Sequence, residues 1–266
     1  MRRGLIGIGH RARFARWLEG GAAGVECVEL TAEHFFDAPD SLLKTIGGLY
    51  PCSVHGLGLS LGTPGPLDEP TLRAYGRVAR LSRARWVSEH VAFTRAGGID
   101  LGHLNPIAPT ERNLSVLIEH ALMVHELTGC SVCLENITTE LRLEGDLTET
   151  EFLNRLCAAS PHIRLLLDVT NLFINARNHR FDASGWLAEL EPRIVSQIHV
   201  VGFSEHHGRL TDDHRRPVQP EILALMAVAA DRHQVDAVIL ERDLDIPEPS
   251  ELIAELSRVR QSLGWN

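Results

Sequence analysis

The chain has 266 residues and a formal net charge of −9 at pH 7, and 44% of its residues are hydrophobic against 23% that are charged. This apolar content is enough for a full core, and about 250 residues is an ordinary length for one α/β barrel. Negative charge without clustered Lys and Arg excludes the electrostatic footprint of a protein that binds nucleic acid or an anionic membrane. We therefore expect neither partner.

The first residues and the cysteines indicate the compartment. The segment MRRGLIGIGHRARF lacks the apolar core and the cleavage site of a secretory signal, and no apolar run approaches the roughly 18 residues of a spanning helix. The five cysteines form an odd set that lies mostly inside apolar segments, which favours buried thiols over a disulfide framework. The C-x-x-C pair of Cys130 and Cys133 has no second pair, so no zinc site is expected there. The sequence thus predicts a cytoplasmic protein.

Strand-like and helix-like stretches alternate along the whole chain, which is typical of a parallel sheet with helical crossovers. Apolar strand-like runs occupy residues 4–9, 25–30, 52–57, 85–90, 131–136, 164–169, 196–201 and 237–242. Apolar residues at helical spacing predict helices at 69–83, 110–128, 149–158, 219–234 and 249–263. Helix starts are indicated by Thr148 with Glu151, by Asp182, and by Pro249 with Ser250. About eight strands close a (β/α)8 TIM barrel, so we expect one barrel domain over residues 1–266.

Two connections are longer than the others, and each follows a predicted strand. They run over residues 94–109 and 203–217. Because the loops after the strands form the active-site face of such a barrel, these segments are candidates for a lid or for substrate contacts.

Several strand-like runs end in a side chain that can bind a metal or move a proton. The residues are His55, His90, Glu135, Asp168 and His199. Since the carboxyl ends of barrel strands meet at one face, these side chains are expected to converge although they are scattered in sequence. Glu241 closes the circle at the last predicted strand, and a polar loop carries Asp212 and His214 as a D-x-H pair.

Taken singly, these residues also have purely structural interpretations. His55, His90 and His199 could be buried histidines that are satisfied by hydrogen bonds. Glu135 could form an ion pair with an arginine of a neighbouring loop, because a buried carboxylate is costly without a partner.

The remaining residues have similar alternatives. Asp168 and Asn171, three positions apart, could form an Asx turn or a helix N-cap. Asp212 and His214 could be ordinary loop residues, and Glu241 with its charged neighbours could be a solvated strand end. Core packing alone does not explain why successive strands end in ligand-type residues at the same face, whereas a multinuclear metal site requires that arrangement. The combined pattern therefore predicts a metal centre.

The motifs around these residues resemble those of a known family. They are HGLGLSLG, SEHVAF, LENITTEL, LDVTNLFINARNH, IHVVGF, DDHRRPV and the terminal ERD. In this order they resemble the multinuclear non-haem iron-dependent oxidative enzymes over nearly the whole chain. The resemblance implies a TIM barrel like that of xylose isomerase, which holds two or three Fe ions in mixed Fe(II)/Fe(III) states and uses dioxygen (O2) as co-substrate.

Carried over by position, the resemblance also implies the ligands. The central iron pair, with Glu135 bridging, would be held by the catalytic set His55, His90, Glu135, Asp168, His199 and Glu241. A third metal would be held by Asn171, Asp212 and His214. Where relatives often continue D-x-H with another acidic residue and a histidine, this chain has Arg215 and Arg216.

The implied activity is oxidation of a ribosomally synthesised precursor peptide, commonly at Cys, and many members act with a separate peptide-recognition protein. In such a centre a ferric ion would lower the pKa of the substrate thiol and hold the peptide, and a ferrous neighbour would supply electrons to dioxygen. Hard nitrogen and oxygen donors tolerate Fe(III), and a ligand set without Cys leaves the substrate thiolate without a competitor.

Two other enzyme classes and a binding protein remain as alternatives. Barrels of this shape also host zinc-dependent hydrolases such as apurinic endonucleases, but this chain lacks the basic track that phosphate binding needs. Sugar isomerases on the related fold use metals such as manganese, but only 5% of the residues are aromatic, which leaves few to stack on a sugar. A non-catalytic binding barrel would leave the aligned ligand-type residues unexplained.

Overall fold

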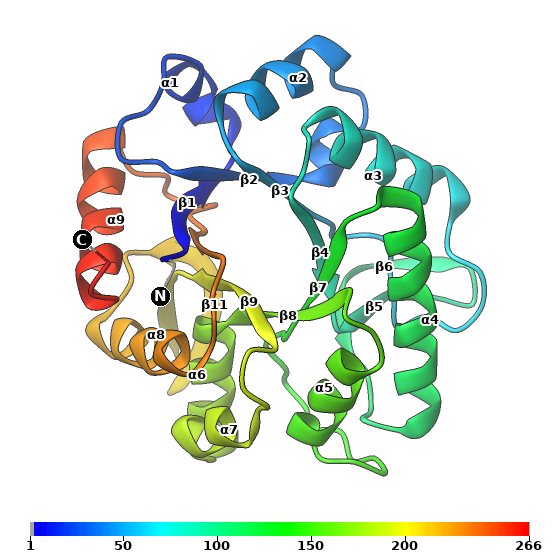
Figure 1. Ribbon diagram of the computed structural model, residues 1–266. Helices are drawn as coiled ribbons and strands as arrows, with labels where there is room; N and C mark the ends of the chain where they lie inside the picture. The colour runs from blue at the N-terminus through cyan, green and yellow to red at the C-terminus, as the bar shows by residue number, and fades with distance from the viewer. Residues whose placement is uncertain (1–2, 266) are drawn as a thin grey trace.

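The computed structural model describes residues 3–265, and within them eight parallel strands close into a barrel that is surrounded by helices (Figure 1). The strands follow one another around the barrel in the order β1-β12-β9-β8-β7-β4-β3-β2. They are β1 (Leu5–Gly9), β2 (Cys27–Thr31), β3 (Cys52–His55), β4 (Trp86–His90), β7 (Ser131–Glu135), β8 (Ile163–Asp168), β9 (Val195–Val200) and β12 (Ala237–Leu240). The predicted α/β barrel and its strands are confirmed. The expected domain over residues 1–266 also includes Met1, Arg2 and Asn266, which lie outside the described residues.

The barrel strands are buried almost throughout, because one face fills the barrel interior and the other packs under the helices. This is why the sequence shows continuous apolar runs rather than an alternating pattern. Polar residues are concentrated where the strands end: His55, His90, Glu135 and Asp168 are the last residues of β3, β4, β7 and β8. The strand register sets His90 beside Glu135 and Asp168 beside His199.

Helices cover the outside of the barrel, and the predicted helices are all present. The helical segments are η1 (Ala12–Phe14), α1 (Ala15–Glu19), η2 (Ala32–Phe35), α2 (Asp40–Leu49), α3 (Glu69–Leu81), α4 (Glu111–Thr128), α5 (Glu149–Ala158), α6 (Val169–His179), α7 (Ala183–Glu189), α8 (Pro220–Arg232) and α9 (Pro249–Ser262). Thr148 caps α5 by accepting from the backbone N–H of Glu151, and Asp182 caps α7, as predicted. Helix α9 begins at Pro249. Helices α1, α2 and α6 were not predicted, and for α7 the sequence indicated only the start.

The two long connections are not irregular loops, because each folds into an antiparallel hairpin. One consists of β5 (Ala92–Ala96) and β6 (Ile99–Pro106), and the other of β10 (Gly202–His206) and β11 (Arg209–Arg216). The first turns at Gly97 and Gly98, whose φ angles of 57° and 81° suit glycine and a tight hairpin turn. The hairpins follow β4 and β9, so both rise from the face where the barrel strands end.

Two further expectations concern the cysteines and the membrane. The five cysteines are free thiols, four of them buried and Cys130 half-buried, which agrees with their apolar sequence context. Burial raises the pKa of the Cys52 thiol to about 12. Among the helices of the described residues, none is both long and apolar enough to cross a bilayer.

Candidate metal centre

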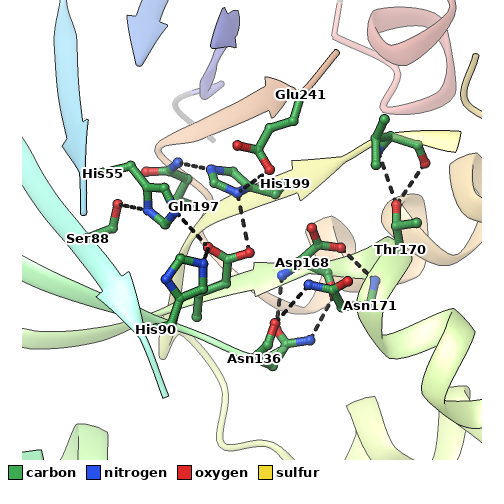
Figure 2. A network of polar contacts seen from close by, with 12 residues as sticks. His55, Ser88, His90, Asn136, Asp168, Thr170, Asn171, Gln197, His199 and Glu241 are labelled. Carbon is green, nitrogen blue, oxygen red and sulfur yellow. Dashed lines mark hydrogen bonds and ion pairs between the residues drawn. The ribbon is translucent and has the colours of Figure 1, made fainter. Parts of the chain in front are cut away.

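The side chains at the strand ends converge on one buried site. His55, His90, Asp168, His199 and Glu241 point into the same space in Figure 2, although they come from β3, β4, β8, β9 and the residue after β12. Each is buried, and Asp168 and His199 are 0% exposed. Ligand-type atoms lie within 4.8 Å of one another in two groups: His55, His90 and Glu135 form one, and Glu135, Asp168, His199 and Glu241 form the other. Glu135 belongs to both.

The two oxygens of Glu135 face different neighbours. Its Oε2 lies 3.4 Å from Nε2 of His55 and 3.5 Å from Nε2 of His90. Its Oε1 lies 3.5 Å from Nδ1 of His199, and that nitrogen is 3.0 Å from Oε2 of Glu241. A carboxylate placed in this way can bridge two cations. The predicted alternative of an arginine partner for Glu135 is not what the structure shows, since its ion-pair partners are histidines.

Several buried atoms at this site make no hydrogen bond to any described residue. They are Oε2 of Glu135, Oδ2 of Asp168, Oδ1 of Asn171 and Oδ1 of Asp212. Nδ1 of His199 also lacks a well-aligned hydrogen bond, although Oε2 of Glu241 lies 3.0 Å away. A buried polar atom without a partner is costly, and buried carboxylates are usually paired or bound to a cation. The donors are imidazole nitrogens and carboxylate or amide oxygens, a set that suits iron, manganese or zinc. The residues therefore fit a multinuclear metal site.

The pKa values reflect how strongly these groups interact. Burial by itself would lower the pKa of His199, but the carboxylates of Glu241, Glu29 and Glu135 outweigh it and hold that pKa well above its usual range. Burial raises the pKa of Asp168 well above its usual range, and the nearby charges of Asp212 and Glu135 raise it further. A cation at the site would remove both effects, because it would take the place of the proton on His199 and neutralise the crowded carboxylates.

Asp168 fulfils both of the roles that the sequence left open. Its Oδ1 accepts a 2.7 Å hydrogen bond from the backbone N–H of Asn171 and caps helix α6. Its Oδ2 is the buried, unpartnered atom that faces the cluster. The N-cap and the candidate ligand are therefore two oxygens of one side chain.

The D-x-H pair joins the same cavity from hairpin β10–β11. This cavity has a volume of about 320 Å³, and its lining includes Asn171, Asp212 and His214 together with His55, His90, Glu135 and Glu241. Nε2 of His214 lies 2.9 Å from Oδ2 of Asp212. Burial would lower the pKa of His214, but Asp212 and Asp243 raise it well above its usual range. The structure thus brings the predicted third-metal residues to the rim of the central cluster.

The two arginines that follow His214 do not face this cavity. Arg215 pairs with Asp245, at 2.9 Å, and also with Asp213. Neither Arg215 nor Arg216 is among the described residues that line the cavity.

Sequence reasoning missed some residues of the site. Glu29 on β2 is 2% exposed, and its Oε1 lies 2.8 Å from Nε2 of His199. Ser53 and Gln197 donate hydrogen bonds to its other oxygen. The available signal was the acidic content of the otherwise apolar run VECVEL, which contains Glu26 and Glu29, because an unpaired carboxylate is rarely buried. His34, which was not among the predicted site residues, also lines the cavity.

Solved structures with the same fold support the barrel type. A D-psicose 3-epimerase with D-fructose has a TM-score of 0.64 at 14% identity, covering 98% of this chain and 97% of that one. A xylose isomerase domain protein from Planctomyces limnophilus has a TM-score of 0.57 at 11% identity, with coverage of 99% and 96%. Endonuclease IV from Thermus thermophilus has a TM-score of 0.59 at 19% identity, with coverage of 98% and 100%. At these identities the likeness shows the fold alone, and it confirms the predicted xylose isomerase-like TIM barrel.

Relatives found by sequence have higher identity to this chain than the solved structures above. A UPF0276 protein of Rhizorhabdus wittichii is 34% identical over 265 residues, covering 98% of this chain and 95% of that protein. A UPF0276 protein of Chromobacterium violaceum is 31% identical over 264 residues, with coverage of 98% and 95%. The model of the family described as RiPP precursor modification enzyme MbnB/TglH/ChrH matches residues 5–263, which includes every barrel strand and every candidate ligand. The chain therefore belongs to the MbnB/TglH/ChrH family of RiPP precursor modification enzymes.

Proposed function

We propose that this protein is an iron- and O2-dependent oxidase that modifies a ribosomally synthesised precursor peptide at Cys residues. The family supplies the coarser part, namely modification of a RiPP precursor. The observation that supports the finer part is the double position of Glu135, whose oxygens face a His55/His90 group and a group with Asp168, His199 and Glu241. A bridging carboxylate between two nitrogen- and oxygen-rich sites is an arrangement that suits a redox-active pair of iron ions.

The proposed ligand set follows from this arrangement. One iron would be held by His55, His90 and Glu135, and a second by Glu135, Asp168, His199 and Glu241. A third would be held by Asn171, Asp212 and His214, which line the same cavity. When bound, mixed Fe(II)/Fe(III) ions would supply a site that lowers the pKa of a substrate thiol and a source of electrons for dioxygen.

The chain's own residues explain how a peptide thiol could use this site. Cys is not among the described residues that line the cavity, so no protein thiolate competes for the metal. Leu57, Leu104 and Ile137 form apolar parts of the wall. Ile137 is buried and limits access of water, whereas Leu57 is 40% exposed. Leu104 lies on β6, so the first hairpin contributes to the wall, and we propose that both hairpins contact the peptide.

The same lining disfavours the two alternative enzymes. Among the described lining residues Arg11 is the one arginine or lysine, and it is paired with Asp243, so a nucleic-acid phosphate would find no free cation. The described lining contains no Trp, Phe or Tyr on which a sugar could stack. Trp86, which flanks His90 in sequence, begins β4 at the opposite end of the barrel and donates to Gln197.

The test combines metal analysis with oxygen consumption. Protein purified without oxygen is expected to hold more than one iron per chain and to consume O2 when given a Cys-containing precursor peptide. A peptide with Ser in place of Cys is the matched control and is expected to leave O2 consumption at background. Zinc as the sole metal, with hydrolytic activity restored by zinc alone, would refute the oxidase.

Two accessory features belong to the same proposal. A separate peptide-recognition protein would deliver the precursor, and its omission from the assay is expected to lower the rate at limiting peptide. A reducing cytoplasmic setting would keep the substrate thiol reduced, in keeping with the free thiols of this chain.

A further inference from the structure

A line of alternating charges crosses the rim of the cavity and ends at His214. Nε of Arg11 donates a 2.5 Å hydrogen bond to Oδ1 of Asp243. Oδ2 of Asp243 lies 3.0 Å from Nδ1 of His214, and Nε2 of His214 lies 2.9 Å from Oδ2 of Asp212. Arg11 follows β1 and Asp243 follows β12, so this contact joins the first and last strands of the barrel.

The contacts determine which ring nitrogen of His214 is available. Carboxylates only accept hydrogen bonds, and each ring nitrogen of His214 faces one, so without a metal both nitrogens carry a proton. A cation that takes the place of the proton on Nε2 would leave the proton on Nδ1, where Asp243 holds it. Nε2 faces Asp212, and the unpartnered atoms Oδ1 of Asp212 and Oδ1 of Asn171 belong to the same cavity. The orientation is therefore the one that a metal ligand needs.

Asp243 also holds the backbone of His214. His214 has a φ of 50°, a left-handed conformation that costs a non-glycine residue free energy and persists only where its surroundings fix it. The carbonyl oxygen of His214 accepts hydrogen bonds from the backbone N–H groups of Asp243, at 3.0 Å, and of Leu244, at 3.2 Å. Asp243 thus fixes the ring through its carboxylate and the main chain through its amide.

Arg11 keeps Asp243 in this role. Asp243 lines the cavity, and its carboxylate could otherwise turn inward and bind a cation directly. The guanidinium holds Oδ1, and it is itself anchored by a 2.8 Å hydrogen bond from Nη1 to the carbonyl oxygen of His10. The side chain of Arg11 is 11% exposed and that of Asp243 is 38% exposed, so the guanidinium is shielded from solvent more than the carboxylate that it holds.

We propose that Asp243, held by Arg11, is a positioning residue that orients His214 and so controls whether the third metal is bound. The inference rests on the third metal of the proposed function and requires neither oxygen nor a peptide. Removal of a carboxylate that orients a metal-bound histidine typically weakens metal binding by about 10- to 100-fold. Nothing comparable is expected for charges nearby that do not touch His214.

The experiment is an anaerobic titration of the metal-free protein with Fe(II), with the affinity of each equivalent read by chelator competition. Asp243→Asn is expected to lower the affinity for the third Fe(II) equivalent by about 10- to 100-fold and to leave the affinities for the first two unchanged. The matched control is Asp245→Asn, two residues further along, where the aspartate pairs with Arg215 and does not contact His214. Asp245→Asn is expected to change no equivalent.

A second measurement separates positioning from general destabilisation. In 15N-histidine-labelled, zinc-loaded protein, NMR reports which nitrogen of His214 carries the proton. The wild type and Asp245→Asn are expected to show a proton on Nδ1 and a metal-bound Nε2, and Asp243→Asn a loss of that signature. Arg11→Lys is expected to retain part of the affinity, and Arg11→Gln to lose more.

The outcomes distinguish this inference from the proposed function. Wild type that binds only two metals would overturn the third site and the positioning role, while leaving the central pair intact. Wild type that binds three metals, with an unchanged last equivalent and an unchanged His214 signature in Asp243→Asn, would overturn the positioning role alone. Iron-dependent oxidation could fail in either case without affecting the result, since the titration measures binding only.

Discussion

Asp168→Asn is expected to stabilise the protein when metal is removed and to destabilise it relative to wild type when metal is present. Asp168 is 0% exposed, and burial together with the charges of Asp212 and Glu135 raises its pKa well above 3.8. Asparagine resembles the protonated carboxyl. Its carbonyl oxygen can keep the bond from the N–H of Asn171, because Asn and Asp cap helices about equally well.

The magnitude follows from proton linkage. A carboxyl whose pKa is raised in the folded state contributes stability that is fully present below its unfolded pKa and is lost as pH rises toward the folded pKa. Each pKa unit corresponds to about 1.4 kcal/mol in the free energy of unfolding, and about three units separate pH 7 from the pKa of the carboxyl in the unfolded chain. The charge on Asp168 can therefore cost the metal-free wild type at most about 4 kcal/mol at pH 7. The Asp168→Asn protein does not lose this stability as pH rises, because an amide does not ionise. Its advantage in chelated protein should therefore be small near about pH 5 and larger near about pH 8.

Bound metal reverses this order of stability, so that the wild type becomes more stable than Asp168→Asn. A cation that binds only the folded state stabilises the wild type by about 2.7 kcal/mol at a concentration about 100 times its Kd and by about 4.1 kcal/mol at about 1,000 times, so an Fe(II) concentration above about 1,000 times the Kd outweighs even the ceiling of about 4 kcal/mol. Asparagine offers a neutral, weaker ligand in place of Oδ2 of Asp168, and most of this gain is expected to disappear. Metal analysis should find at least one ion fewer per chain.

The assay is urea unfolding of both proteins at the two pH values, with chelator and with Fe(II) under anaerobic conditions. Asp182→Asn is the matched control, because Asp182 also caps a helix, lies on the surface and is remote from the cluster. Its effect is expected to be small and independent of metal. A metal-free Asp168→Asn protein that is less stable than wild type at both pH values would refute the argument that Asp168 carries a costly buried charge.

Four further variants test other parts of the structure. Glu135→Ala and His199→Ala are expected to leave the barrel folded, as measured by circular dichroism, and to abolish turnover, because each removes a ligand of the proposed iron pair. Full iron content and an unchanged rate in either variant would show that the ligands of the pair are misassigned. His214→Ala should lose only the third metal and keep partial activity, and an unchanged metal-to-protein ratio would count against that site. Glu255→Ala leaves the buried guanidinium of Arg242 without its 2.8 Å partner and is expected to cost about 3–5 kcal/mol in urea unfolding with metal content unchanged. A much smaller loss would mean that Arg242 is satisfied by its other contacts.

The sequence by itself determined the barrel and the face that carries the site. A buried parallel strand must be apolar along its whole length, so the few polar residues that end β3, β4, β7 and β8 stood out. Because all parallel barrel strands end at one face, their convergence followed from topology without any knowledge of distances. The family resemblance then named the candidate ligands in chain order, and the family match confirmed the resemblance.

Only the tertiary structure decided how those residues are combined. The division into two groups that share Glu135 depends on where each oxygen points, and side-chain direction is set by packing rather than by sequence position. Glu29 contacts His199 from another barrel strand, and Asp243 contacts His214 from the segment after β12, so no local sequence pattern encodes either pair. The hairpins were hidden for a related reason. Their strands pair only with each other, and most residues of β6 and β11 are exposed or half-buried, so they lack the continuous burial that marks a barrel strand in the sequence.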